Sequence, residues 1–476
     1  MTTLIMNGLV YNGGGERPLK TNILIKNTLI ARIGDFSRPR VDETLDASGT
    51  YVMPGFVDVD ILSDDAPQSI FEHSTQERLV RQGITTVIGG GESVSLAPVL
   101  SRFVKKMWEW HSVADVLKSI ERRGCTVNFG TLVGYATMRY GIVGSVSRDI
   151  TDGELETLEN LLRKEFQSGA FGLSAEYGFP HARPSPFHEA PALLKVVAEA
   201  RRIYAPRFRC SGEDILSDLS EILSLAIQTG VNTEINNFQP CLPYGDRYGE
   251  AARRMLEESG RTNIHFDLGP CESVRLDGLE LLPQWLRQHD VQEILDSLEQ
   301  TAVCERVLAH FKKHTHDDLV VDRVHDPSLS FLVGKQVRSI AAIRGESLEK
   351  TLFELLQLAR ARISFLSKSV DRDMTEKLLT HQNAIISSGD GASQGSFLKR
   401  VVDRVAAPLE KEIAKATSLP AQKYRIEKRG ALKEGYHADI VIMRDFEPTH
   451  VLVNGSFALR DGIPQNVFAG KALRCR

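Results

Sequence analysis

The sequence has few cysteines, no long apolar run and no large excess of charge of either sign. Its six cysteines are scattered without a Cys-x-x-Cys pair, which argues against a disulfide framework or a zinc ribbon and favours buried thiols. No stretch approaches the roughly 20 apolar residues of a membrane span, and no basic region followed by an apolar run opens the chain. We therefore expect a cytoplasmic protein with no membrane partner. A net charge of −4 also argues against a nucleic-acid partner.

Apolar strand segments alternate with amphipathic helical segments through most of the 476 residues. This alternation favours parallel βα units. A capping box, formed by Thr151 and Glu154, opens one of the predicted helices. The predicted strands lie at about residues 51–65, 83–88, 125–134, 169–174, 202–208, 232–238, 263–268 and 383–388. Eight such strands predict a (β/α)8 TIM barrel with its chemistry at the C-terminal strand ends.

Short strands separated by glycine and asparagine turns occur at both ends of the chain, and one turn is Asn454-Gly455. We expect residues 1–53 and 427–476 to form one small β-sandwich domain. Residues 54–426 are expected to form the barrel, with an inserted subdomain at about 275–345.

The first predicted barrel strand follows the turn Pro54-Gly55 and is the stretch on which the site depends. Because side chains alternate along a strand, Asp58 and Asp60 should point into the barrel. Val57 and Val59 should then face the helix layer.

Pro54-Gly-Phe-Val-Asp-Val59 resembles the first barrel strand of the amidohydrolase superfamily. Further phrases narrow the resemblance to the N-acyl-D-amino-acid deacylase (D-aminoacylase) branch. They are Gln82-Gly-Ile-Thr-Thr-Val87, Gly169-Ala-Phe-Gly-Leu-Ser174 and Leu282-Pro-Gln-Trp285. The resemblance implies an amide-hydrolysing barrel enzyme with a terminal β-sandwich and a catalytic metal.

The residues that the resemblance assigns to metal binding are all replaced in this chain. The positions of the family's ligands are occupied by Asp60, Leu62, Glu92, Arg207 and Asn237. The family's catalytic aspartate corresponds to Asp390, with a shift of one residue. Leucine cannot bind a metal, and a protonated arginine repels one. We therefore expect no zinc site of the family's kind.

Two arrangements of these residues remain open. In the first, a single hard divalent cation binds Asp60, Glu92 and Asp390, because oxygen ligands suit Mg²⁺, Mn²⁺ or Ca²⁺. In the second, Arg207 occupies the volume of the absent metal and pairs with Asp60, Glu92 or Asp390. We favour the second arrangement, which needs no cofactor.

The predicted substrate contacts are also altered relative to the family. Gln239 stands where the family has a lysine that reads the substrate carboxylate. Arg139 and Ser174 match family positions near the strand ends, where they bind substrate or hold the loops in place. Tyr135 replaces a histidine of the family and is either a substrate contact or a core tyrosine with a satisfied hydroxyl. Arg209 is a further candidate for substrate binding. An N-acyl-D-amino acid is therefore not a secure assignment.

Three functions fit these residues. In the first, a metal-independent enzyme acts on an amide or N-acyl amino-acid-like small molecule by hydrolysis, cyclisation, condensation or isomerisation. Asp390, Asp60 or Glu92 would then be the general acid or base, and Arg207 with Asn237 would stabilise an oxyanion. In the second, the chain is an inactive pseudoenzyme that binds a partner enzyme or another copy of itself. In the third, it is a hydrolase with a carboxylate-only metal site.

Overall fold

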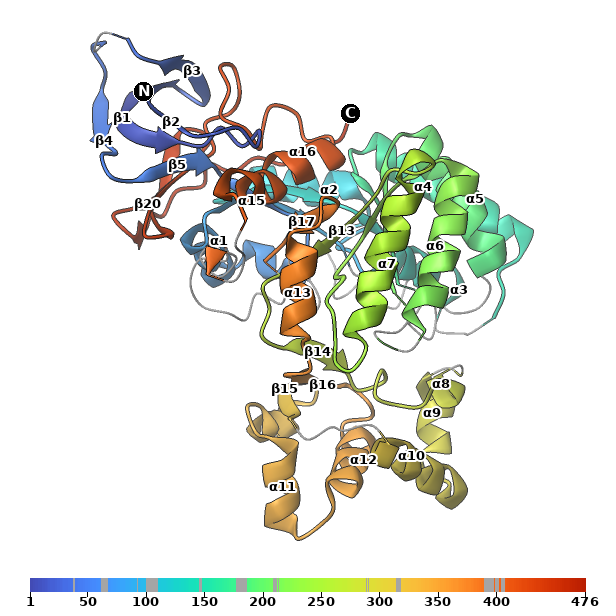
Figure 1. Cartoon of the computed structure of the whole chain (residues 1–476). Helices are drawn as coiled ribbons and strands as arrows, with labels where there is room; N and C mark the ends of the chain where they lie inside the picture. Colours follow the sequence, from blue (N-terminus) through green and yellow to red (C-terminus); the bar gives the residue numbers. More distant parts are fainter. Residues whose placement is uncertain are drawn as a thin grey trace.

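The computed structural model describes the whole chain apart from residues 37–38, 61–66, 92, 100–109, 145–147, 177–185, 209–211, 213, 288, 290, 314–317, 389–397, 399–401 and 404–406. Its largest unit is a ring of parallel strands surrounded by helices (Figure 1).

The barrel strands occur in two parallel ladders, β6-β7-β8 and β9-β10-β11-β12-β13-β17. β8 and β9 follow each other with one residue between them, and Ser388 N donates to Asp58 Oδ1 at 3.2 Å beside the other junction, between β17 and β6. The predicted (β/α)8 barrel is confirmed. Its strands are β6 (Phe56–Asp58), β7 (Ile84–Gly89), β8 (Asn128–Thr131), β9 (Val133–Gly134), β10 (Gly172–Glu176), β11 (Ile203–Arg207), β12 (Asn232–Ile235), β13 (Ile264–Leu268) and β17 (Ala384–Ile386).

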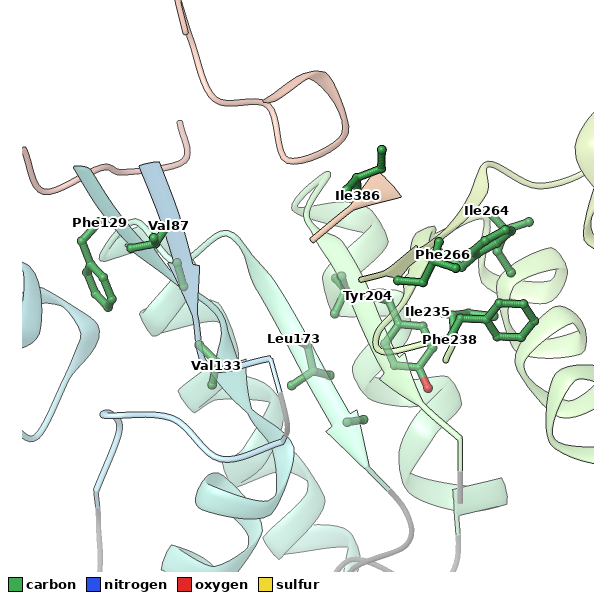
Figure 2. Close-up of a cluster of buried hydrophobic side chains, with 14 of the residues drawn as sticks. Val87, Phe129, Val133, Leu173, Tyr204, Ile235, Phe238, Ile264, Phe266 and Ile386 are labelled. Carbon is green, nitrogen blue, oxygen red and sulfur yellow. The ribbon is translucent and has the colours of Figure 1, made fainter. Parts of the chain in front are cut away.

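The barrel strands carry apolar side chains on their outer face, and helices cover that face. Figure 2 shows outward-facing side chains such as Val87, Leu173, Tyr204 and Phe266, which belong to the same buried cluster as the inner faces of the helices. The helices are α1 (His73–Arg81), α2 (Val113–Arg123), α3 (Tyr135–Val143), α4 (Asp152–Gln167), α5 (Pro186–Glu199), α6 (Ile215–Thr229), α7 (Gly245–Glu257), α13 (Arg372–Leu379), α15 (Leu409–Ala416) and α16 (Ser418–Lys423). Thr151 and Glu154 form the predicted capping box of α4. Throughout the described part of the chain, no helix combines the length and apolar character needed to cross a bilayer.

A separate apolar cluster fills the barrel interior and includes Val57, Val59, Ile203, Ile385 and Tyr424. The prediction that Val57 and Val59 face the helices is therefore wrong. The pairing of β6 with β7 shifts register between Phe56 and Val57. The extra residue at this shift is Thr85 of β7, so β6 keeps its alternation, with Phe56 in the outer cluster and Val57 in the inner one. Alternation separates the two faces of a strand but does not say which face the barrel encloses.

Both ends of the chain contribute to a second unit, as predicted. β5 pairs with β1 in parallel and with β18 antiparallel, which joins the two ends into one nine-stranded sheet. Strands from both ends bury one apolar cluster that contains Ile25, Ile30, Leu452 and Phe457. The strands are β1 (Thr2–Val10), β2 (Leu19–Lys26), β3 (Leu29–Gly34), β4 (Glu43–Asp46), β5 (Tyr51–Pro54), β18 (Ile440–Arg444), β19 (Glu447–Val453), β20 (Ser456–Arg460) and β21 (Ile463–Pro464).

An insertion follows β13 and projects from the barrel (Figure 1). It has its own apolar cluster and a three-stranded antiparallel sheet in the order β14-β16-β15. Its elements are β14 (Val274–Asp277), α8 (Gln284–Arg287), α9 (Val291–Ser297), α10 (Thr301–Lys313), β15 (Val320–Val324), α11 (Val337–Arg344), α12 (Leu348–Leu358) and β16 (Ile363–Ser367). These elements continue past residue 345, since β16 pairs with both β14 and β15. The division of the chain at residues 53 and 426 stays a prediction.

A buried polar network joins the terminal domain to the barrel. Asp439 is paired with Arg429 and also accepts from Asn128 Nδ2 of β8 at 3.1 Å. Asn454, in the turn between β19 and β20, donates its backbone N–H to Asp439 at 2.7 Å and its side-chain amide to Asn128 at 2.8 Å. The side chains of Asp439 and Arg429 are each only 3% exposed, so each charge depends on the other.

Removing one member of this pair should destabilise the protein strongly. Asp439→Ala leaves the Arg429 guanidinium buried without its counter-ion, and we expect a loss of about 3–5 kcal/mol in the free energy of unfolding. Glu159→Ala, which breaks the exposed Glu159–Arg163 pair of α4, should cost less than about 1 kcal/mol. Denaturant titration of both variants measures the difference. Equal losses would contradict the structural role of the buried pair.

Candidate functional site

The C-terminal ends of the barrel strands bring polar side chains from four neighbouring strands together. Glu176 at the end of β10 lies opposite Arg207 at the end of β11 in the strand register. Asn236, directly after β12, donates its backbone N–H to Pro206 O at 2.8 Å. Asp267 lies near the end of β13. Parallel pairing places these residues at one end of the ring, where barrel enzymes carry their chemistry.

Arg207 forms an ion pair with Glu176, with Nη1 and Oε2 separated by 4.0 Å. The side chains are 20% and 9% exposed respectively, so the charges meet in a largely dehydrated place. The predicted partners of Arg207 were Asp60, Glu92 and Asp390. Glu92 and Asp390 lie outside the described residues, and Glu176 was not considered from the sequence.

Asp60 is buried just beyond β6. Its backbone N–H donates to Asp58 Oδ1 at 3.3 Å. A Cβ added to Gly91 would lie 3.6 Å from Asp60 Oδ1 and 3.0 Å from Asn236 Nδ2, so the loop after β7 meets both residues. The same amide of Asn236 donates to Gly91 O at 2.7 Å. Asp60 therefore lies beside the loop that follows β7 and the residue that follows β12.

Asn237 adopts a left-handed backbone conformation with φ of 52° directly after the strand end. Asparagine tolerates this conformation better than most residues. Its backbone N–H donates to Asp267 Oδ1 at 2.9 Å. The side chain is half-buried. The backbone contact with Asp267 of the next strand holds the turn that carries this side chain.

A carboxyl pair beneath this rim was missed from the sequence. Glu234 of β12 and Asp267 of β13 are both fully buried and hydrogen-bonded to each other. Tyr424 OH donates to Glu234 Oε2 at 2.7 Å, and Ser387 Oγ donates to Asp267 Oδ2 at 2.6 Å. Burial, together with the charge of Asp60, raises the pKa of Glu234 to about 7.

The two carboxyl groups of this pair share protons. Burial and the neighbouring charge of Glu234 raise the pKa of Asp267 well above its usual range. Two adjacent buried carboxylates cannot both be charged at low cost, so the pair favours a protonated form. A sequence signal existed, because each of the two acidic residues stands within a predicted barrel strand.

The predicted substrate contacts are engaged within the protein. Tyr135 OH donates to Glu189, and Arg139 Nε lies 3.2 Å from Glu189 Oε2. Ser174 Oγ donates to Gly90 O, and Gln239 Nε2 donates to Thr375 Oγ1 at 2.9 Å. These contacts correspond to the loop-holding alternative of the prediction. Arg209 lies outside the described residues.

The described donor set does not fit a zinc ion of the deacylase kind. Within the described residues, no group of three or more histidine, cysteine, aspartate and glutamate side chains is arranged to hold a metal. An arginine and an asparagine occupy the ends of β11 and β12, and guanidinium groups do not bind cations. Leu62, with Glu92 and Asp390, lies outside those residues.

The carboxyl pair should make stability fall as pH rises. The folded-state pKa values are above the ordinary values near 4, so between about pH 4.5 and 7 the folded state holds more protons than the unfolded state. The free energy of unfolding then decreases with pH, by up to about 1.4 kcal/mol per pH unit for each group.

Glu234→Gln removes one of these titrating groups and should flatten the decrease across this window. Glu159→Gln, on the exposed face of α4, should leave the slope unchanged. Denaturant titrations at pH 5, 6 and 7 provide the comparison. Parallel curves for wild type and Glu234→Gln would show that Glu234 is ionised normally.

Comparison with known proteins gives relatives among the N-acyl-D-amino-acid deacylases. No family model matches the chain. The N-acyl-D-aspartate deacylase of Alcaligenes xylosoxydans xylosoxydans is 24% identical over 489 residues, which cover 98% of this chain and 90% of the relative.

Two solved structures share the fold across the full chain. A crystal structure of D-aminoacylase has a TM-score of 0.82 and 22% identity, with 99% of both chains covered. An N-acyl-D-glutamate deacylase from Bordetella bronchiseptica, in complex with zinc and a phosphonate inhibitor, has a TM-score of 0.79 and 22% identity, again with 99% of both covered. The predicted resemblance is therefore confirmed: over nearly its whole length, this chain is similar to the N-acyl-D-amino-acid deacylases of the amidohydrolase superfamily.

Proposed function

We propose that this protein is an enzyme that acts on a C–N bond of an amide or N-acyl amino-acid-like small molecule, through a site that works without a metal. The observation that carries the proposal is the cation Arg207 beside Glu176 at the strand ends. A guanidinium there supplies the positive charge that a metal supplies in the zinc-bound relative.

The proposed roles follow from the chemistry of each side chain. Arg207 and the side-chain amide of Asn237 donate hydrogen bonds to the oxygen of the amide carbonyl, where negative charge develops. A carboxylate, Asp60, Glu92 or Asp390, takes a proton from the attacking group and returns it to the leaving nitrogen. The attacking group is water in hydrolysis. In condensation or cyclisation it is an amine that attacks a carboxyl or amide carbon, and the proton passes to the leaving oxygen or nitrogen.

Asp267 has a positioning role in this proposal. It accepts the backbone N–H of Asn237 and is itself bonded to Glu234 and Ser387. This chain of contacts fixes the left-handed turn that carries the Asn237 amide. Catalytic groups depend on such supporting contacts for their geometry.

The inactive alternative has one observation in its favour. Tyr135, Arg139, Ser174 and Gln239 all bond to protein groups, which leaves fewer of the predicted side chains to bind substrate. A pseudoenzyme would bind its partner without turning over a small molecule.

Replacing Arg207 should separate the active from the inactive alternative. Arg207→Met removes the guanidinium but keeps much of the side-chain length, and we expect kcat to fall by about 100- to 1,000-fold. Arg163→Met, which breaks an exposed pair on α4, should leave kcat unchanged. Turnover is measured by mass spectrometry on a panel of N-acyl-D- and N-acyl-L-amino acids and their cyclic amides. Absence of turnover in the wild type, with normal circular dichroism, would favour the pseudoenzyme.

Removing metal should leave the activity in place. Protein treated with a chelator and checked by elemental analysis should retain its full kcat, because no proposed step uses a metal. Adding Zn²⁺ or Mn²⁺ should not increase it. Loss of activity with the chelator, restored by one equivalent of Mn²⁺, would instead support the carboxylate-only site of Asp60, Glu92 and Asp390.

A further inference from the structure

A cavity of about 530 Å³ lies at the opposite end of the barrel from Arg207 and Asn237. It is bounded by the segments that lead into β11, β12 and β13 and by α16. In Figure 1, α16 lies across the end of the barrel away from the insertion. This basal cavity is separate from the proposed catalytic site.

The lining of the basal cavity carries charge of one sign. Arg201, Arg202, Lys423 and Arg425 contribute to it, and none of the lining residues is acidic. Among the described residues, no ion pair joins any of these four to an aspartate or glutamate within 4 Å, although Arg202 Nη1 donates to Arg476 O at 3.1 Å. Arg201, Lys423 and Arg425 therefore leave an excess of positive charge at the cavity walls.

A second cavity, between α6 and α7, shows that this is not a general property of the surface. It is lined by Arg253, Arg254 and Arg261 but also by three glutamates. Each of these arginines forms an ion pair with a glutamate of the same helical segment. The positive charges of this second cavity are neutralised by glutamates of its own lining, whereas the lining of the basal cavity contains no acidic residue.

Lys423 is the most buried cation of the basal cavity. Its Nζ lies 2.8 Å from Asn263 O, 3.1 Å from Asn263 Oδ1 and 2.9 Å from His265 Nδ1. The two oxygens of Asn263 are uncharged. His265 is also neutral, because burial and the charge of Lys423 lower its pKa to about 3. Burial lowers the pKa of Lys423 itself to about 7. A buried ammonium is costly unless an anion accompanies it.

The arginines are held in an uncommon backbone conformation. Arg201 and Arg425 have φ of 51° and 57°, where residues with a Cβ are disfavoured. Arg425 Nη1 donates to Arg201 O at 3.2 Å, which links the two turns. Strain of this kind is often associated with functional positions.

Two polar atoms of the lining residues are buried without a hydrogen-bond partner. They are Nε of Arg202 and Oδ1 of Asn232. The remaining nitrogens of Arg202 donate to Phe166 and to the final two residues, including Cys475 O at 3.0 Å. The unused donor of Arg202 is thus a further group that an anion could satisfy.

We propose that the basal cavity binds a small molecule through a phosphate group, which accepts hydrogen bonds from Arg425 and Arg201, with the charge of Lys423 close by. Several converging cations favour a dianion over a monoanion, and a phosphate monoester carries nearly two negative charges at neutral pH. The planar guanidinium fork also matches phosphate oxygens. The volume leaves room for an organic group beyond the phosphate.

Isothermal titration calorimetry of the full chain with inorganic phosphate and with phenyl phosphate tests this proposal at low ionic strength. We expect saturable binding that Arg425→Gln and Arg201→Gln each weaken by about ten-fold or more. Both side chains are exposed, so neither variant should impair folding. Arg253→Gln, in the neutralised groove between α6 and α7, should bind like the wild type.

Three results would overturn the proposal. They are no saturable phosphate binding by the wild type, equal affinity in the wild type and both cavity variants, and an equal loss in Arg253→Gln. Succinate serves as the competing dianion, and tighter binding of succinate than of either phosphate would assign the cavity to dicarboxylates. None of these results depends on catalytic turnover, so the test is independent of the proposed function.

Discussion

The energetic constraint on which this barrel depends is the cost of keeping ionisable groups out of water. Asp60, Glu176, Glu234 and Asp267 are all buried near the mouth or in the interior. Their surroundings differ: Glu176 lies beside an arginine, and Asp267 lies against Glu234 with its pKa raised by burial and by that neighbour. Hydroxyl groups from Tyr424 and Ser387 donate to this carboxyl pair. The cost of burying these carboxyl groups is therefore offset by contacts with one another and with neighbouring donors.

The two ends of the barrel carry side chains of opposite charge. Among the described residues, the mouth holds several carboxylates and the cation Arg207, whereas cations gather around Lys423 at the basal end. Tyr424, next to Lys423 on the chain, contacts Glu234 of the mouth-side pair. The end of α16 thus contributes to both environments: Lys423 lines the basal cavity, and Tyr424 reaches Glu234 inside the barrel.

Strong local signals made most of the fold predictable. The alternation of strands and helices, the capping box at Thr151 and the family phrases all report local preferences that the tertiary structure did not override. The orientation of Val57 and Val59 was not predictable, because alternation separates the two faces of β6 without saying which one the closed barrel encloses. The partner of Arg207 was missed for a similar reason, since Glu176 reaches it only through the pairing of β10 with β11.

The sequence by itself determined the barrel and the terminal domain that both ends of the chain share. These follow from residue identity and local periodicity, which one chain carries in full. Only the tertiary structure decided which carboxylate meets Arg207, which carboxyl pair shares a proton, and which cations converge beneath the strands. Those relations join residues far apart in the chain, and their energies depend on distance and burial, which exist only after folding.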